Sequence, residues 1–449
     1  MIPGKFDSFQ KITSYFFLKS LKTSTSNLLA LALIILFSLS CSSTKRFTKR
    51  EAKVNEVKTE ENTTINITEE KSETEFNYDE IRVSMQGLIP SESLTIESPI
   101  YLYDDKNKLA LDKVGNKINC YEDKGKIILE INEQNFDGEK FVLVSAEREE
   151  IIKINGKKFR GKIQISSSGN SLEIVNVINL EDYVKGVLAK EMPLGRDSEN
   201  FEALKALAVC IRTYAIQKMK DGKIYFDIYA DTRDQVYGGM DAEKPISNMA
   251  VDETKKLILK FNGQVTDIFY HSTCGGYTES SANVFTKEEI PYLNSIKDGE
   301  EPNCNISPRF KWEENYSKDL IIDRLKSYSL LENRSYDLED VSVISRFSSG
   351  RVNELEIVVV DDSGWNKSVI LKGNEIRNVI RNSDGKNILW STMFDVELNS
   401  NSVLLSGKGF GHGVGLCQWG AISLSRHGWD FREILDFYFP GTDLGQMND

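Results

Sequence analysis

The chain has 449 residues, of which 40% are hydrophobic and 28% are charged, which is typical of a globular protein with two or three domains. Its formal net charge of −12 argues against a nucleic-acid partner, because phosphate contacts need clustered Lys and Arg. The chain contains three histidines, which argues against a histidine-rich metal site. We therefore expect no cofactor, no metal and no nucleic acid.

Residues 1–41 have the features of an export signal. Four lysines precede an apolar run from Leu28 to Leu39, which is too short to cross a bilayer because a membrane helix needs about 20 residues. Cys41 follows at once, as in the bacterial lipoprotein signal, where this cysteine is lipidated and becomes the mature N-terminus. Ser38 departs from that pattern, which usually has Leu. Plain secretion and an uncleaved anchor are the alternatives, and each places the remaining chain outside the cytoplasm, in a periplasm or at the cell surface.

Residues 42–77 are rich in Lys, Glu, Thr and Asn and contain very few apolar side chains. Such a segment cannot bury enough surface to offset its conformational entropy, so the composition predicts a disordered tether. Its typical reach is about 30–36 Å, taken as roughly 5–6 Å × √n.

Residues 78–176 form a predicted β-rich region. Short apolar runs such as Lys126–Ile131 and Phe141–Val144 are typical of strands. Asp137-Gly138 and Asn155-Gly156 are turn dipeptides, and Asn-Gly strongly favours a tight hairpin. No cluster of catalytic residue types occurs here, so we interpret this region as a packing module.

Two helices are predicted on either side of Pro193, at the start of a domain spanning residues 177–449. In the first, Tyr183 to Leu188 contribute an apolar stripe, and Pro193 prevents its continuation. The second runs from about Ser198 to Met219, because apolar residues recur there at helical spacing. Arg212 lies beside this stripe and either pairs with a structural carboxylate or binds a substrate anion.

Glu191 closes the first helix and is the candidate general acid. A helix C-terminus carries partial negative charge, which disfavours a nearby carboxylate and raises its pKa. A proton donor needs such a raised pKa. The alternative is an ordinary surface glutamate before a proline.

The C-terminal half is predicted to contain further strands and short helices. The predicted elements are a hairpin over 257–261 and 264–270 that leads into His271–Gly276, a hairpin over 341–360, a strand over 369–371, a helix from Glu375, a helix starting inside the glycine-rich stretch 407–421 and ending by Gly428, and a helix over 430–437. The fold class expected is α+β, with mixed antiparallel β-rich lobes and a few helices around a central cleft.

The glycine-rich stretch does not fit a nucleotide-binding motif. The dinucleotide fingerprint needs glycines at relative positions one, three and six, and neither Gly409 nor Gly411 starts such a pattern. Within this stretch, His412 and Gln418 could bind a substrate by hydrogen bonds, or could serve packing and turn formation.

Five cysteines remain after Cys41, and the odd count leaves at least one unpaired. His271 and Cys274 have a spacing that metal ligands use, but a structural zinc site takes four ligands and no second compact pair is present. In an exported chain, a Cys274–Cys304 disulfide is the simpler interpretation. A Cys–His hydrolase built on Cys274 and His271 would need an orienting Asn or Asp that the sequence does not identify.

At these motifs the chain resembles the stage II sporulation protein D / LytB family. The matching stretches are LEDYVKGVLAKEMP, EALKALAVCIRTYAI, QVYGG, YHSTCGGYTESSANVF with IPYLNSI, and GKGFGHGVGLCQWGA with GWDFREILDFYFPGT. They occur in the family's order, and the likeness is strong from Val177 onward. Cys417 stands where the family commonly has Ser.

The resemblance implies a peptidoglycan lytic transglycosylase that cleaves the MurNAc–GlcNAc β-1,4 bond and leaves a 1,6-anhydro-MurNAc end. It implies Glu191 as the catalytic acid and then base. The substrate-cleft candidates are Arg212, Tyr237, His271, Ser272, His412 and Gln418. The partners expected are peptidoglycan glycan strands, a membrane through the lipid anchor, and a cell-wall amidase. The alternative is a non-catalytic wall-binding protein that enhances such an amidase.

Overall fold

The computed structural model describes residues 78–447 apart from 107, 115–116, 148–149 and 287, and these residues belong to one compact unit, 74–449. The predicted signal, the lipidation site Cys41 and the tether lie outside the described residues. In the part of the chain that is described, no helix has the length and apolar character needed to span a membrane.

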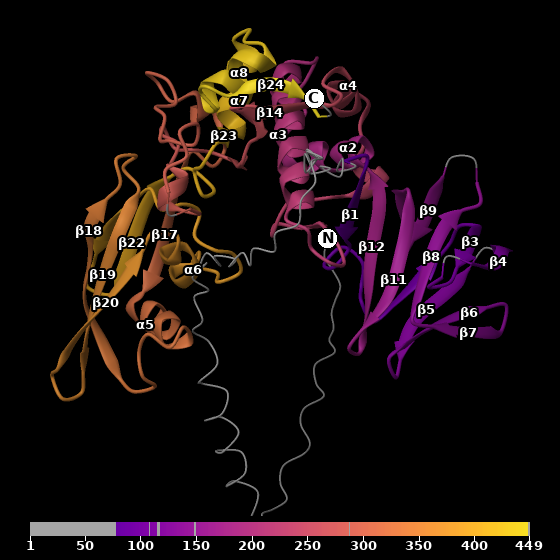
Figure 1. Cartoon of the computed structure of the whole chain (residues 1–449). Coiled ribbons are helices and arrows are strands. Elements are labelled where there is room, and N and C mark those ends of the chain that lie inside the picture. Colours follow the sequence, from indigo (N-terminus) through magenta and orange to yellow (C-terminus); the bar gives the residue numbers. More distant parts are fainter. Residues whose placement is uncertain (1–77, 107, 115–116, 148–149, 287, 448–449) are drawn as a thin grey trace, which may run out of the picture. The chain divides into compact units, whose positions relative to one another are not determined.

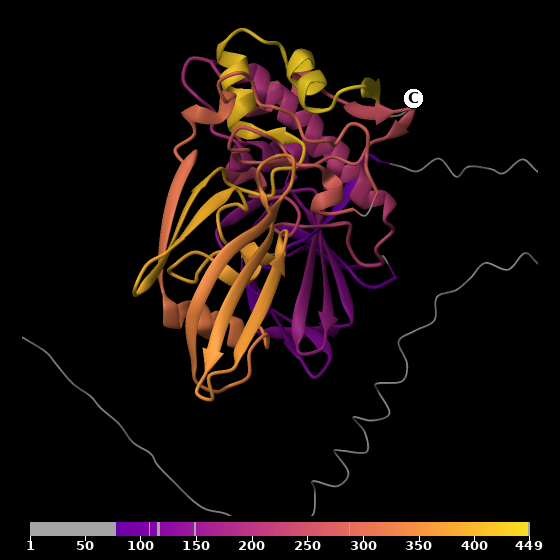
Figure 2. The ribbon, with the colours of Figure 1, turned by 90° about the vertical axis from the view of Figure 1, so that its left-hand side faces the viewer.

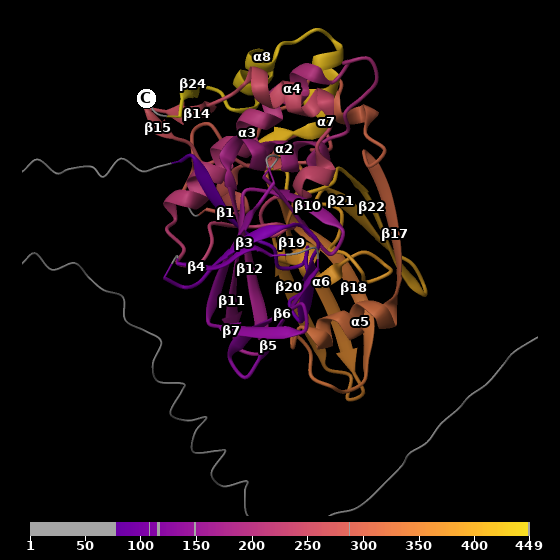
Figure 3. The ribbon, with the colours of Figure 1, turned by 90° about the vertical axis from the view of Figure 1, so that its right-hand side faces the viewer.

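Residues 78–179 are almost entirely β-structure, as predicted, and one short strand from further along the chain joins them. The strands are β1 (Glu80–Ser84), β2 (Ser93–Ile96), β3 (Ile100–Tyr103), β4 (Leu109–Val114), β5 (Ile118–Asp123), β6 (Lys126–Ile131), β7 (Gln134–Gly138), β8 (Lys140–Ser145), β9 (Ile151–Ile154), β10 (Lys157–Arg160), β11 (Lys162–Ser168), β12 (Ser171–Asn179) and β13 (Ile228–Tyr229). They form a seven-stranded sheet in the order β13-β1-β12-β11-β8-β3-β4 and a six-stranded sheet in the order β10-β9-β2-β5-β6-β7. Figure 3 shows β1, β12 and β11 side by side.

One of the two predicted turns is confirmed and the other is wrong. Asn155 and Gly156 join β9 to β10 with φ of 47° and 79°, the left-handed pair that a two-residue hairpin needs. Asp137 and Gly138 instead lie in β7, opposite β6, and the turn between those strands is Asn132-Glu133. Both residues of this turn have positive φ, which a glutamate adopts only at a steric cost, so the sequence did not signal it.

A long helix organises the second layer. The helices are α2 (Leu180–Glu191), α3 (Phe201–Lys220), α4 (Pro245–Glu253), α7 (Gln418–Arg426) and α8 (Phe431–Tyr438). The helix α3 packs against the other four, and the labels of α7 and α8 lie close to it in Figure 1. The N-terminal strands and these helices share one hydrophobic core. Val177 lies inside β12.

The predicted strand over 264–270 is interrupted. The elements found are β14 (Leu257–Phe261), β15 (Gln264–Val265), β16 (Tyr270–His271), β23 (Leu416–Cys417) and β24 (Asp443–Gln446). β15 pairs with β14 through two residue pairs, after which the chain leaves this sheet. β16 then pairs in parallel with β23, which lies far along the sequence. Gly415, at φ 73°, permits this exchange because a Cβ there would collide with the carbonyl of Phe269.

Residues between β16 and β23 form a second core. Its elements are β17 (Lys311–Ser317), α5 (Lys318–Ser327), β18 (Tyr336–Arg346), β19 (Val352–Asp361), β20 (Asn366–Lys372), α6 (Glu375–Ile380), β21 (Phe394–Leu398) and β22 (Ser402–Lys408). Two three-stranded sheets, β17-β22-β21 and β18-β19-β20, bury its apolar side chains, and Figure 2 shows β18 to β20 as the long orange strands.

Most of the C-terminal predictions are confirmed. The hairpin turning near Ser349-Gly350, the strand over 369–371, the helix from Glu375 and the two last helices are all present. The helices α4 and α5 were not predicted, and neither were the 3-10 turns η1 (Gly239–Ala242), η2 (Ser281–Asn283) and η3 (Asn303–Ile306). The α+β fold class is confirmed, since helices and mainly antiparallel sheets are both abundant.

Candidate active site

Glu191 is the last residue of α2, and the helix is fixed at both ends. Asn179 caps its start, where the side-chain oxygen accepts the Glu181 N–H at 3.0 Å. Met192 adopts extended backbone and ends the helix one residue before Pro193. The apolar stripe predicted for α2 is buried. The helix therefore holds Glu191 in a defined place.

The carboxyl of Glu191 is half-buried and accepts two hydrogen bonds. The backbone N–H of Val236 donates to Oε1 at 2.8 Å, and the side chain of Gln418, the first residue of α7, also hydrogen-bonds to this carboxyl. Burial raises the pKa of Glu191, whereas these two hydrogen bonds lower it by stabilising the charged form, and the net shift is upward. The raised pKa thus has burial as its main cause rather than the helix end on which the sequence argument relied.

Charged groups are missing from this environment. Within the described residues, Glu191 has no ion pair within 4.0 Å, and no second carboxylate contributes to its pKa shift. Its field instead reaches the buried phenols of Tyr183 and Tyr270. Tyr183 donates to Gln235 at 3.0 Å, which fixes the loop that carries Val236. The site is therefore a single protonatable carboxyl among neutral polar groups.

Gln418 is the cleft candidate that the structure brings to Glu191. It is 7% exposed and starts α7 immediately after Cys417. The next residue, Trp419, donates its backbone N–H to the carbonyl of Ser272 at 3.1 Å. Ser272 itself is half-buried, and its hydroxyl contacts that of Thr273. The hydrogen bond from Trp419 to Ser272 ties the end of β16 to the start of α7.

His271 and His412 are held by backbone groups. His412 accepts the Val414 N–H on Nδ1 at 3.1 Å and donates from Nε2 to the carbonyl of Tyr270 at 3.0 Å. Burial, with smaller contributions from Arg377 and Arg351, lowers the pKa of His412 to about 3. The residue is therefore neutral at any physiological pH, with its proton on Nε2.

His271 is neutral as well. Its Nδ1 donates to the carbonyl of Val414 at 3.1 Å, and burial keeps its pKa well below the usual range. Its Nε2 is buried without a hydrogen-bond partner among the described residues. Both imidazoles thus hold the glycine-rich stretch against β16. No contact of either ring with Glu191 is found in the described part of the chain.

Arg212 and Tyr237 are interior residues. The Arg212 side chain is fully buried, and its Nε and Nη2 donate to the two oxygens of Glu181 at 3.0 and 2.7 Å. Of the two roles open for Arg212, the structure selects the structural ion pair. Tyr237 is 1% exposed, stacks on Tyr183 and donates to Asn176 at 2.8 Å. We therefore do not propose either residue as a substrate contact.

The predicted Cys274–Cys304 disulfide is not formed. The two Sγ atoms are 3.4 Å apart, well beyond the length of a disulfide bond, about 2.05 Å. Cys417 and Asp298 occupy the same small volume, so the Cys274 sulfur contacts the Asp298 carboxyl as well as Cys304. Sequence reasoning missed Asp298 because it lies in an irregular segment, with no ligand-like spacing to mark it.

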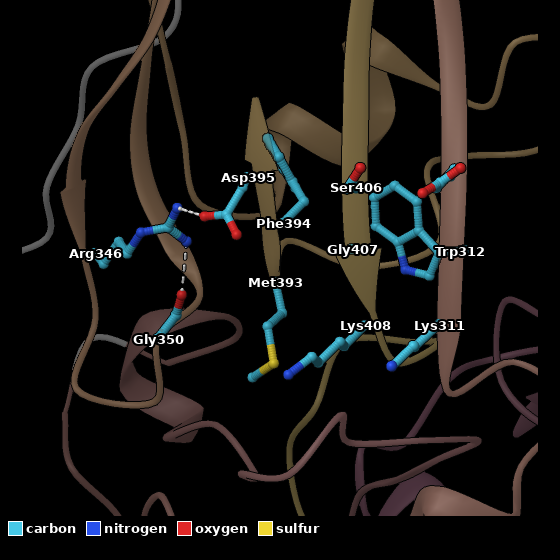
Figure 4. Close-up of a pocket in the computed structure, with 11 residues that line it drawn as sticks. Lys311, Trp312, Arg346, Gly350, Met393, Phe394, Asp395, Ser406, Gly407 and Lys408 are labelled. Atoms are coloured by element: carbon cyan, nitrogen blue, oxygen red, sulfur yellow. Dashed lines mark hydrogen bonds and ion pairs between the residues drawn. The ribbon is translucent and has the colours of Figure 1, made fainter. Parts of the chain in front are cut away.

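The structure has one cavity beside Glu191 and another on the second core. A cavity of about 400 Å³ is lined by Lys190, which precedes Glu191 in the sequence, and by Val236, which donates a hydrogen bond to Glu191. A cavity of about 690 Å³ lies on the second core, where Trp312 and Phe394 form its apolar side and Lys311 and Lys408 extend along its rim (Figure 4). None of the predicted site residues lines this second cavity.

Comparison with known proteins agrees with the motifs. Residues 168–261 match the family model described as stage II sporulation protein, and residues 300–415 match a domain of unknown function, DUF8618. The first match contains α2, Glu191 and α3, and the second contains the second core. The chain therefore contains a segment that matches the SpoIID family model, in the part where the sequence motifs predicted the resemblance.

Three relatives are similar over much of the chain. An uncharacterized protein of Brachyspira hyodysenteriae is 28% identical over 83% of this chain and 94% of the relative. The amidase enhancer of Bacillus subtilis is 30% identical over 58% of this chain but only 40% of the relative. The stage II sporulation protein D of Bacillus subtilis is 28% identical over 61% of this chain and 76% of the relative. The chain thus spans less than half of the amidase enhancer.

Proposed function

We propose that this protein is a peptidoglycan lytic transglycosylase in which Glu191 acts first as acid and then as base. The observation that carries the proposal is a solitary, partly buried carboxyl with a raised pKa, held by Val236 and Gln418. Such a group stays protonated to higher pH than an exposed glutamate, which is what donation to a leaving oxygen requires.

The reaction needs one carboxyl if the sugar supplies its own nucleophile. Glu191 transfers its proton to the glycosidic oxygen as the bond from that oxygen to C1 of MurNAc breaks. The 6-hydroxyl of the same MurNAc then bonds to C1, and its proton passes to the Glu191 carboxylate, which restores the acid. Ordinary glycosidases instead need a second carboxylate to activate water or attack C1. The absence of a second carboxylate influencing Glu191, within the described residues, favours the intramolecular route.

The two hydrogen bonds to Glu191 suit this double role. They stabilise the carboxylate after it has lost its proton, while burial stabilises the acid before the reaction. The opposing effects bring the two protonation states closer in free energy, so that one group can both donate and accept.

The place of action that we propose is the cell wall outside the cytoplasm, with the chain anchored through lipidated Cys41. The names of the Bacillus relatives and the signal-like N-terminus support this proposal. Glycan strands are the proposed substrate.

The test is product analysis by mass spectrometry after incubating the full chain with peptidoglycan, with and without prior removal of stem peptides. We expect 1,6-anhydro-MurNAc ends from the wild type, and a loss of about 10²–10⁴-fold in Glu191→Gln. The matched control is Glu339→Gln, an exposed residue of β18, which should retain the wild-type rate. Products with a hydrated reducing end, or an active Glu191→Gln, would contradict the proposal.

The second candidate is a non-catalytic enhancer of a cell-wall amidase, which the name of one relative favours. In that case the chain would bind peptidoglycan and yield no anhydro product. The wild type and the Glu191→Gln variant would accelerate an added N-acetylmuramoyl-L-alanine amidase equally well. The same incubations with the amidase present separate the two functions.

A further inference from the structure

Three thiols and one carboxylate lie together at the start of α7. Their ligand atoms, from Cys274, Asp298, Cys304 and Cys417, all lie within 4.8 Å of one another, and all four residues are buried. The Sγ atoms of Cys274 and Cys304 are 3.4 Å apart, and Cys274 Sγ lies 3.1 Å from Oδ2 of Asp298. Tetrahedral zinc sites with bonds of about 2.0–2.3 Å place their ligands at roughly 3.4–3.8 Å from one another. The cluster therefore has nearly the dimensions of a zinc site.

We propose that Cys274, Asp298, Cys304 and Cys417 form a structural zinc site. Thiolate-rich sets select zinc over calcium or magnesium, which prefer oxygen ligands. Four protein ligands fill a tetrahedral zinc completely, as in closed structural sites, so this site leaves no position for a substrate or water. It is thus separate from the reaction at Glu191.

The surroundings orient the four ligands as a metal site requires. Tyr438 donates to Oδ1 of Asp298 at 2.7 Å, which leaves Oδ2 facing the thiols. The backbone N–H groups of Cys274 and Gly420 point at Cys417 Sγ at 3.2 and 3.4 Å, and that of Gly276 points at Cys274 Sγ at 3.4 Å. Outer hydrogen bonds of this kind hold ligands in place and stabilise thiolates.

The N-terminus of α7 adds to this effect. Cys417 is the N-cap residue of a nine-residue helix, and its sulfur accepts the Gly420 N–H. A helix N-terminus carries partial positive charge and favours an anion. Gly420 cannot carry a Cβ without colliding with Tyr438, so the packing around Asp298 depends on the absence of a side chain.

A buried cation lies against the cluster. Arg351 is 1% exposed, donates from Nη2 to the carbonyl of Cys274 at 2.6 Å, and has no hydrogen-bond partner for Nε and Nη1 among the described residues. Glu279, a carboxylate whose charge acts on Arg351, already accepts hydrogen bonds from Ser280, Asn283 and Ser349. Three thiolates and a carboxylate around Zn²⁺ leave an excess of negative charge, and Arg351 lies where it offsets that charge.

A disulfide explains fewer of these observations. Joining Cys274 to Cys304 would leave the Cys417 thiol and the Asp298 carboxyl buried side by side without a common partner. Zinc uses all four groups and protects the thiols from oxidation outside the cytoplasm. The site also links β16, η3 and α7, so it would fix Gln418, which follows Cys417, beside Glu191.

The first test measures zinc in the purified full chain by elemental mass spectrometry. We expect about one zinc per chain, with clear loss in Asp298→Asn and in Cys417→Ser, neither of which would break a Cys274–Cys304 disulfide. Cys210→Ala is the matched control, since Cys210 is a buried thiol of α3 outside the cluster, and it should retain zinc.

Thiol counting and cobalt keep the test decisive where a variant fails to fold. In the wild type, denaturation with a chelator should expose all three cluster thiols without reductant. Replacing zinc by Co²⁺ should give the charge-transfer absorption of cobalt thiolates. A pair of thiols that reacts only after reduction, together with no zinc and no cobalt spectrum after metal loading, would overturn the proposal. Because the readouts are metal content and spectrum, they are independent of whether the chain cleaves glycan.

Discussion

The region around Glu191 and the region of the second core differ in the partners of their polar groups. Around Glu191, buried side chains pair with one another, as Tyr183 does with Gln235 and Arg212 with Glu181. In the second core, buried Arg324 and Arg377 donate to backbone carbonyls instead, and pairs such as Arg346–Asp395 lie near solvent. Burying a polar group costs about 1–3 kcal/mol unless it is paired, so such groups indicate function where they gather.

The largest effect should come from breaking a buried ion pair in the first region. Arg212→Ala leaves the Glu181 carboxylate buried without its partner, and we expect a loss of about 3–5 kcal/mol in the free energy of unfolding. Urea denaturation measures this loss. The double variant Glu181→Leu/Arg212→Met should recover much of the stability, because it removes both charges. A single variant as stable as wild type would show that the buried pair is not essential.

The next effect concerns position rather than chemistry. Glu191→Asp keeps the carboxyl but withdraws it from Val236 and Gln418, and we expect a loss of about 10²-fold in the rate of glycan cleavage. Lys408→Ala, on the rim of the cavity in the second core, should leave the rate of bond cleavage unchanged. Equal losses in both variants would erase the contrast between the regions. Initial rates of anhydro-product formation provide the comparison.

Stability should depend on pH through Glu191 with a defined sign. Its pKa is raised in the folded state, so the native protein holds a proton more tightly than the unfolded chain does, and stability falls as pH rises above the ordinary glutamate pKa. Glu191→Gln removes this loss. We expect the variant to melt at a higher temperature than wild type at pH 7, with the difference shrinking toward pH 4. A lower melting temperature at pH 7 would argue against a raised pKa.

The smallest effect should come from an exposed pair. Arg346 and Asp395 are 2.7 Å apart, but their side chains are 34% and 89% exposed. Solvent screens such pairs, so Arg346→Ala should cost less than about 1 kcal/mol, and the cost should shrink at high salt. Denaturation at two salt concentrations gives both values, and a loss as large as that of Arg212→Ala would remove the distinction drawn here.

Sequence alone predicted those parts in which local chemistry decides the structure. The helix ending at Glu191 was evident from its apolar stripe and Pro193, and the Asn155-Gly156 hairpin from its dipeptide. The turn at Asn132-Glu133 was missed because the connection imposes a conformation that glutamate does not favour.

The thiol cluster and the environment of Glu191 depend on distant contacts. Cys417 and Asp298 join Cys274 only because β16 pairs with β23 across more than a hundred residues. Likewise, the donor from Val236 is a backbone group, which no side-chain pattern announces. Such sites follow from the topology of the chain, and local sequence rules do not reach them.

The pairing of β17 with β22 has an evolutionary consequence. Lys311 lies opposite Lys408, and Trp312 opposite Gly407, so the segment between them departs and returns at one point. Closing a loop costs only slowly more as it lengthens, and an insertion whose ends already meet imposes little strain on its host. The second core therefore has the form of a cassette, whose length can change without displacing the helix that carries Glu191.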